Sequence, residues 1–298
     1  MGMQKIIPSL WFDRTAGEAA EFYASLFPHT TIAHTSSYPS EGVGERQRAF
    51  AGELLTAELE IDGFAITLIN ADASFRPNQA LSFLVHFDPA RDPEAREHLD
   101  DLWAGLLDDG VVHMPLDEYP FSERYGWIED RFGVSWQLML TNPAASPQPF
   151  LTPDFLFGGA MQDRAEEALE FYTSLFADAG VGSIRRYPQQ SGPAASGAVM
   201  FAEFRLEGQA FAAMDSVVEN SDDFTPGFSF QVMCADQDEI DRLWAALSSV
   251  PEAEQCGWCV DRFGVSWQIV PADLPALLST PESYQAMLAM KKIVIADL

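Results

Sequence analysis

Basic residues are scarce in this sequence. It has 17 Lys and Arg against 45 Asp and Glu in 298 residues, which gives a net charge of −28. A surface with this charge repels nucleic acid and anionic membranes, so we expect neither as a partner. We interpret the charge as a property that keeps the protein soluble rather than as an acidic binding function.

Long apolar runs and a cysteine framework are also missing. No apolar segment reaches the ~18 residues that a membrane-spanning helix needs, and the first residues lack the apolar stretch of a signal peptide. The chain has 3 Cys, an odd number that does not suit a disulfide framework. We therefore expect a cytoplasmic protein.

What the sequence does contain is an internal repeat. The octapeptide Asp-Arg-Phe-Gly-Val-Ser-Trp-Gln occurs at residues 130–137 and again at 261–268. A Glu-Phe-Tyr-x-Ser-Leu-Phe segment likewise occurs at 21–27 and at 170–176. Repetition on this scale indicates that the chain is built from two copies of one structural plan.

Each octapeptide predicts a β-hairpin. Asp130 and Gly133 suit a type I turn that is closed by a left-handed glycine. Beyond the turn the residues alternate, so that Trp136 faces a core while Ser135 and Gln137 face the other way. That second face is either a solvated sheet surface or the wall of a cavity, and the alternation leaves both readings open.

The remaining periodicity predicts a strand, a helix and three further strands in each half. In the first half we expect strands at 6–12, 49–61, 64–70 and 81–87, a further strand that begins at 111–114, and the octapeptide hairpin over 126–140. We also expect helices at 15–27 and 92–107, and turns over 30–47. A loop at 116–125 exists in the first half alone, and it is either a lid over a cavity or a plain surface loop. The tail should hold a helix near 283–290 and a short strand at 293–295.

This repeated plan, the Glu-Phe-Tyr helix and the octapeptide hairpin together resemble the vicinal oxygen chelate superfamily of glyoxalases and bleomycin resistance proteins. More narrowly, they resemble its PhnB-like branch, which often carries the name demethylubiquinone methyltransferase. The resemblance implies an α+β fold with two tandem glyoxalase-like modules of paired βαβββ units and curved, mainly antiparallel sheets. It places the modules at 1–142 and 153–271, with a Pro-rich linker at 143–152 and a helical tail at 272–298.

The metal enzymes of this superfamily take their ligands from four strand positions in each site. The resemblance carries these positions onto Ile6, Ile7 or Pro8, Thr67, Ser82 and Gln137, and in the second half onto Thr152 or Pro153, Ala212, Ser229 and Gln268. None of these residues is the His, Cys, Asp or Glu that a transition metal requires. We therefore predict no metal and no other cofactor.

Polar residues on the matched strands form the candidate ligand-binding set: Thr67, Ser82, His86, Gln137, Asp215, Ser229 and Gln268. Their hydroxyl and amide groups would hydrogen-bond a ligand, or they are neutral fillers where ligands once stood. His86 shares the strand face of Ser82 and titrates near neutral pH, although a structural role is the alternative. Asp215 is either a general base or a turn residue at a strand end.

The leading functional hypothesis is metal-independent binding of a small molecule in a cavity lined by the curved sheets. One alternative is an enzyme of the same superfamily, either a metal-dependent lyase or dioxygenase or the methyltransferase that the family name describes. No G-x-G-x-x-G turn opens a helix, which argues against a methyl-donor site of the usual kind. A structural dimerisation module is the third alternative, and hairpin edges and the tail are compatible with a homodimer. No catalytic residue is assigned.

Overall fold

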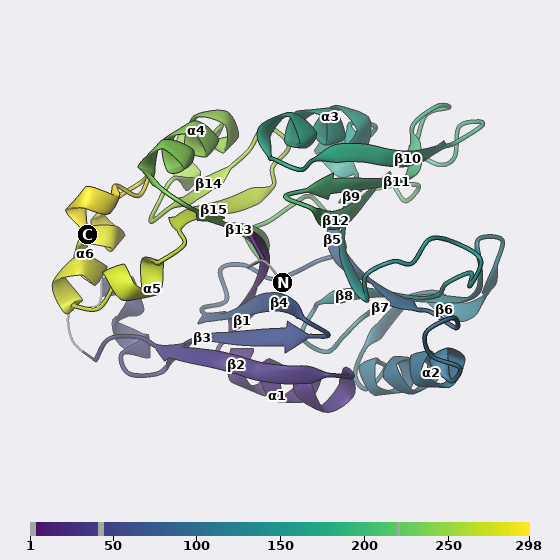
Figure 1. Ribbon diagram of the computed structural model, residues 1–298, viewed down its shortest axis with the longest axis horizontal. Helices are drawn as coiled ribbons and strands as arrows, with labels where there is room; N and C mark the ends of the chain where they lie inside the picture. The colour runs from purple at the N-terminus through teal and green to yellow at the C-terminus, as the bar shows by residue number, and fades with distance from the viewer. Residues whose placement is uncertain (1–3, 41–44, 220) are drawn as a thin grey trace. The chain divides into compact units, whose positions relative to one another are not determined.

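The computed structural model describes residues 4–40, 45–219 and 221–298. The chain divides into two compact units, which are drawn together in Figure 1. Unit 1 comprises the described residues of Met1–Ala24, Thr30–Arg76 and Phe224–Leu298, and unit 2 comprises Ser25–His29 and the described part of Pro77–Asp223. Each unit therefore combines half of one sequence module with half of the other, so the units are not the modules.

Unit 1 contains a seven-stranded sheet with the strand order β14-β15-β13-β1-β4-β3-β2. Its strands are β1 (Ile6–Asp13), β2 (Thr30–Ser37), β3 (Leu54–Ile61), β4 (Phe64–Ala71), β13 (Phe228–Cys234), β14 (Trp258–Val260) and β15 (Ser266–Pro271). Its helices are α4 (Gln237–Leu247), α5 (Leu274–Leu277), α6 (Pro281–Ala289) and most of α1 (Ala16–Leu26).

Unit 2 contains an eight-stranded sheet with the strand order β10-β11-β12-β9-β5-β8-β7-β6. Its strands are β5 (Leu81–Phe87), β6 (Val111–Tyr119), β7 (Ser122–Glu129), β8 (Ser135–Leu140), β9 (Leu151–Phe157), β10 (Gly180–Arg186), β11 (Val199–Leu206) and β12 (Gln209–Asp215). Its helices are α2 (Ala95–Leu106) and α3 (Ala165–Leu175), and short 3₁₀ helices in the two units cover Glu45–Phe50, Gly159–Met161, Pro251–Ala253 and Ile295–Asp297.

The centre of each sheet joins strands from different modules. In unit 1, β1 pairs antiparallel with β13, and in unit 2, β5 pairs antiparallel with β9. The parallel pairs are β1 with β4, β13 with β15, β12 with β9, and β5 with β8, and the other pairs are antiparallel. The predicted α+β fold with paired βαβββ units and mainly antiparallel sheets is confirmed. No helix in the described ranges is long and apolar enough to cross a membrane.

Three predicted elements were wrong. The turn-rich segment begins with an edge strand, β2, because its Thr and Ile residues pair with β3. The candidate lid is an antiparallel hairpin, since Asp117 on β6 lies opposite Tyr125 on β7. The tail has no strand at 293–295, where Ile295 instead starts a 3₁₀ turn. The loop prediction failed because this segment pairs as the bulged edge of the sheet despite its loop-like composition.

The octapeptide closes its own turn through its aspartate. Asp130 Oδ1 accepts hydrogen bonds from the backbone N–H groups of Phe132 (2.8 Å) and Val134 (3.1 Å), and Oδ2 accepts one from Trp136 Nε1 (2.8 Å). Asp261 repeats all three bonds in the second copy, at 2.8, 3.1 and 2.8 Å. Gly133 has φ 86°, as the turn prediction requires. The repeated octapeptide therefore has a structural role, because its aspartate closes the turn and fixes the tryptophan indole in the core.

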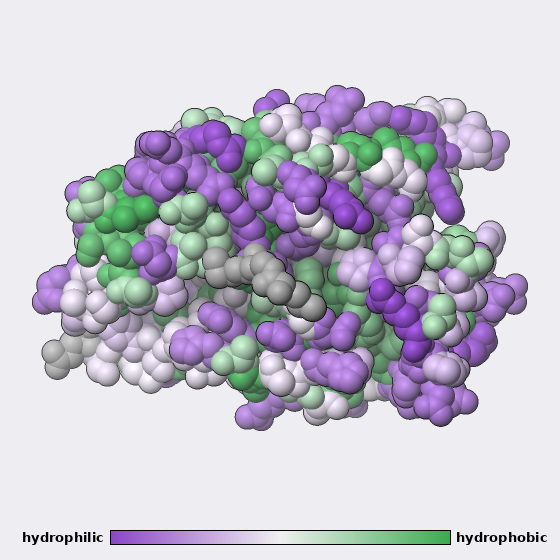
Figure 2. Space-filling model, in the orientation of Figure 1, coloured by the Kyte–Doolittle hydropathy of each residue, from purple (hydrophilic) through white to green (hydrophobic). Residues whose placement is uncertain are grey.

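Hydrophilic residues cover much of the molecular face in Figure 2, in keeping with the net charge of −28. The core of each unit is built from apolar side chains. In unit 2 the Trp136 ring stacks on Phe83 with ring centroids 5.1 Å apart, and in unit 1 the Trp267 ring lies 5.4 Å from that of Phe230. The opposite face of each of these strands carries the polar residues considered next.

Candidate functional site

The strand register of unit 2 brings one carboxylate to the predicted ligand positions. Asp154 on β9 lies opposite Ser82 on β5 and opposite Ala212 on β12. The expected first-strand residue, Thr152 or Pro153, was wrong by one or two positions, so an acidic side chain was missed. A signal was available, because 6–9 (Ile-Ile-Pro-Ser) aligns with 151–154 (Leu-Thr-Pro-Asp) through the shared proline.

Gln137 links this group into one buried network. Its Nε2 donates to Ser82 Oγ (2.9 Å) and to Asp154 Oδ2 (2.8 Å), and its Oε1 accepts from the Tyr125 hydroxyl (2.6 Å). Burial raises the pKa of Asp154 to about 7, although the hydrogen bonds from Gln137 and Ser82 oppose the rise. Burial also raises the pKa of Tyr125. The second face of β8 is therefore buried and not a solvated surface.

Unit 1 has the same arrangement without the acid. Ser9 on β1 lies opposite Thr67 on β4 and Ser229 on β13, which makes Ser9 the counterpart of Asp154. Gln268 Nε2 donates to Ser229 Oγ at 3.0 Å, as Gln137 does to Ser82. The predicted residues therefore come together in two matched groups. In unit 2, Ser82 lies with Gln137. In unit 1, Thr67, Ser229 and Gln268 lie around Ser9.

The donor sets do not fit the metal that the superfamily's enzymes use. Unit 2 offers one carboxylate, a hydroxyl, an amide and Ala212, and unit 1 offers hydroxyls and one amide. A divalent transition metal requires several imidazole, carboxylate or thiolate ligands. Within 4–40, 45–219 and 221–298, no three His, Cys, Asp or Glu side chains are grouped to hold a metal ion. The amide of Gln137 is instead used in hydrogen bonds to its neighbours.

Asp215 belongs to a different setting from the other candidates. Its Oδ1 accepts from the backbone N–H of Ala165, in the first turn of α3 (3.1 Å), and its Oδ2 accepts from Val199 on β11 (2.8 Å). Asn70 makes the matching bond to Ala16 at the start of α1 in unit 1 (3.3 Å). Burial raises the pKa of Asp215 to about 6. These contacts give Asp215 a helix-fixing role away from the pocket described below.

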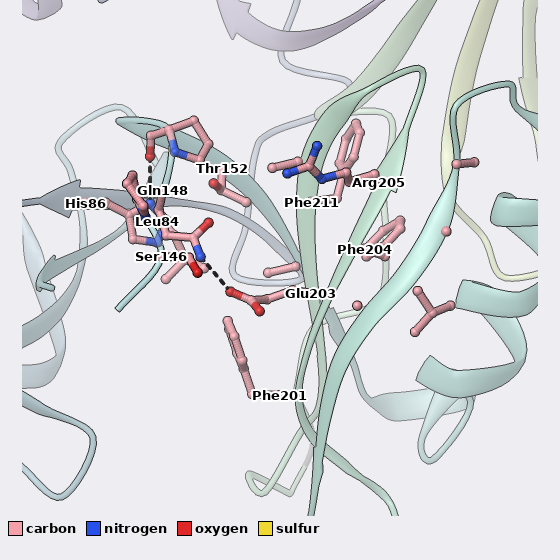
Figure 3. A pocket seen from close by; sticks show the side chains of 18 of the residues that line it. Leu84, His86, Ser146, Gln148, Thr152, Phe201, Glu203, Phe204, Arg205 and Phe211 are labelled. Carbon is pink, nitrogen blue, oxygen red and sulfur yellow. Dashed lines mark hydrogen bonds between the residues drawn. The ribbon is translucent and has the colours of Figure 1, made fainter. Parts of the chain in front are cut away.

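An open pocket of about 460 Å³ lies on the same sheet face as Asp154, over β5, β9, β12, β11 and β10. Figure 3 shows it from close by, with His86, Leu84 and Thr152 on one side and Phe201, Glu203 and Arg205 on the other. The linker contributes Ser146, Pro147, Gln148 and Pro149 to the wall. Among the predicted candidates, His86 is the one that lines this pocket.

His86 is fixed by the linker. Its Nδ1 donates to the carbonyl oxygen of Pro149 at 2.9 Å, and its backbone N–H donates to that of Phe150 at 2.8 Å. Burial lowers the pKa of His86, while the Pro149 carbonyl and the charge of Glu203 oppose the change. A carbonyl oxygen can only accept, so a neutral ring keeps its proton on Nδ1 and its lone pair on Nε2.

The other polar groups of the pocket differ in whether they already have hydrogen-bond or ion-pair partners. Both Glu203 oxygens are engaged, by Gln148 Nε2 at 3.0 Å and by Ser183 Oγ at 2.8 Å. The buried Thr152 hydroxyl has no hydrogen-bond partner in the described part of the chain. Arg205 is the one Arg or Lys in the lining, and no ion pair of it is found among the described residues. Nothing in the sequence periodicity had marked Thr152, Glu203 or Arg205 as neighbours of His86.

A sequence model of the family described as 3-demethylubiquinone-9 3-methyltransferase matches residues 4–139 and 150–270. The chain belongs to this family. The two matched segments of the family are the two sequence modules, and the tandem form of the PhnB-like branch is thereby confirmed.

The chain is also similar to two solved structures. The PhnB protein from Bacillus cereus, which bears the same methyltransferase description, is 34% identical and aligns with 46% of this chain and 100% of its own, at a TM-score of 0.40. Glyoxalase I from Zea mays is 11% identical and aligns with 90% of this chain and 93% of its own, at a TM-score of 0.53. The second likeness shows the shared glyoxalase fold. No curated protein matches the chain.

Proposed function

We propose that this family member binds a small molecule, without a metal ion, in the pocket on the polar face of the unit 2 sheet. The observation that carries the proposal is the buried Thr152 hydroxyl, which lines the pocket and has no partner in the described residues. Buried polar groups in folded proteins almost always find partners, so we expect the Thr152 side chain to turn its hydroxyl toward a bound ligand, which would supply the partner. The pocket volume, about 460 Å³, suits a small organic molecule.

The walls indicate what the ligand is like. Leu84 and Phe201 provide apolar surface, while Thr152, His86 and Arg205 provide separate polar contacts. An apolar enclosure with a few convergent polar groups is typical of ligand sites. The linker residues Gln148 and Pro149 hold Glu203 and His86 in place, so the segment between the modules also shapes the site.

The test is a fragment screen by NMR against the full chain. We expect bound fragments to shift signals of Thr152 and His86, and Thr152→Val to weaken binding about tenfold because it removes one hydroxyl. Thr67→Val is the matched control, since it makes the same change on the unit 1 sheet and should leave binding unchanged. Failure of every fragment to shift these signals would refute the proposal.

Two further arms separate the alternatives. We expect fragment binding to survive treatment with EDTA, and a stoichiometric transition metal in the purified protein would contradict metal independence. The methyltransferase alternative rests on the family description, and it predicts saturable binding of S-adenosylmethionine.

A further inference from the structure

We propose that Nε2 of His86 is the proton acceptor of this pocket and that the ligand presents an acidic O–H group to it. This inference rests on the proposed binding function and adds the chemistry of one contact. Nδ1 is held by the Pro149 carbonyl at 2.9 Å, and the described residues provide no hydrogen-bond partner for Nε2. His86 lines the pocket, and the bond from Nδ1 holds its neutral ring in one tautomer, with the lone pair on Nε2.

The surroundings keep the ring of His86 in its neutral form. Burial lowers its pKa from the usual 6.5, which makes Nε2 a weaker base than in a solvated histidine but leaves its lone pair free of a proton at pH 7. The charged groups that share the pocket are Glu203, Arg205 and Asp178, and the Glu203 carboxylate is the one that opposes the fall in the pKa of His86. Glu203 is a positioning residue here, because its charge stabilises the imidazolium that would form.

The transfer is balanced without any further reactant. The O–H bond of the ligand breaks, its electron pair stays on the oxygen, and a new N–H bond forms at Nε2. The imidazolium then keeps its Nδ1–H bond to the Pro149 carbonyl. The proton passes to water when the ligand leaves or reacts.

Two substitutions separate the roles of the two ring nitrogens. In His86→Asn, the side-chain N–H₂ can replace Nδ1–H as the donor to Pro149, but nothing replaces Nε2. In His86→Gln, the longer amide can place an oxygen acceptor near the position of Nε2, but the donor to Pro149 is lost. The first variant tests the acceptor and the second tests the anchor.

The experiment uses pairs of aromatic fragments that differ in O–H against O–CH₃, with binding to the full chain followed by NMR. We expect the wild type to prefer the O–H member by about tenfold. His86→Asn should lose this preference and His86→Gln should keep it. Equal binding of both members by the wild type, or a preserved preference in His86→Asn, overturns the proton acceptor but leaves the binding function standing. Absence of any binding overturns both.

Chemical modification gives an independent readout. Diethyl pyrocarbonate acylates the unprotonated ring nitrogen of histidine, and we expect peptide mapping to find His86 modified in the wild type. Glu203→Gln should shift the pH profile of this modification to lower pH, because the carboxylate that favours the imidazolium is gone. An unreactive His86 beside a modified, exposed His98 would show that Nε2 is closed to small molecules and would overturn the proposal.

Discussion

Asp154→Asn tests the most unusual electrostatic feature of the fold. The carboxyl is fully buried, and it accepts from Gln137 at 2.8 Å, with no cationic partner in the part of the chain that the structure describes. Burial raises its pKa from 3.8 to about 7, so the folded protein keeps a proton there that the unfolded chain releases at lower pH. Asn resembles the protonated acid in shape and cannot ionise.

The sign and size of the effect follow from proton linkage. Because the folded-state pKa of Asp154 is raised, its contribution to stability is greatest below pH 3.8 and falls as the pH rises to about 7. The two pKa values differ by about three pH units, each worth ~1.4 kcal/mol, so the whole loss is up to ~4 kcal/mol. Most of this loss of stability, ~3 kcal/mol, occurs between about pH 5 and about pH 8.

The assay is urea unfolding of both proteins across this pH range, followed by tryptophan fluorescence. We expect Asp154→Asn to gain ~3 kcal/mol in free energy of unfolding relative to the wild type between the two ends of the range. Asp178→Asn is the control, because Asp178 is exposed and its difference from the wild type should stay nearly constant. A constant difference for Asp154→Asn as well would refute the reasoning that Asp154 is protonated in the folded protein.

The remaining predictions concern the repeated structural residues. Asp130→Ala and Asp261→Ala should each lower the free energy of unfolding by ~3–5 kcal/mol in urea titrations, because each leaves three donors unpaired. Gln137→Leu should lower the free energy of unfolding by ~2 kcal/mol or more beyond the loss in Gln268→Leu, because Gln137 bonds three side chains and Gln268 bonds one. Equal losses in the two variants would contradict the network around Gln137. Asp215→Ala should lower the melting temperature, because two hydrogen bonds from backbone N–H groups are lost, and it should leave fragment binding intact. A loss of fragment binding at unchanged stability would instead show that Asp215 belongs to the binding site.

Local chemistry was enough to predict much of the fold. The octapeptide turn depends on an aspartate and a glycine a few residues apart, and the structure has the left-handed Gly133 where the sequence predicts it. The side-chain bonds of Asp130 that also close the turn came only from the structure. Strand β5 has the predicted bounds, Leu81–Phe87, because its apolar run is short and bounded by loops. Ser82 and Gln137 were both in the predicted candidate set, and the structure joins them by a hydrogen bond of 2.9 Å.

The candidate site depended on contacts that no local pattern contains. Asp154 meets Ser82 only after β9 has paired with β5, and a shift of one residue in the register changes which side chain arrives there. Glu203 and His86 are more than a hundred residues apart in the sequence and share a pocket through the sheet order and the linker. The sequence by itself determined the two modules and most of their strands, because periodicity and turn chemistry are local properties. The tertiary structure alone decided that each sheet combines halves of both modules and that one sheet face carries a buried acid beside an open pocket.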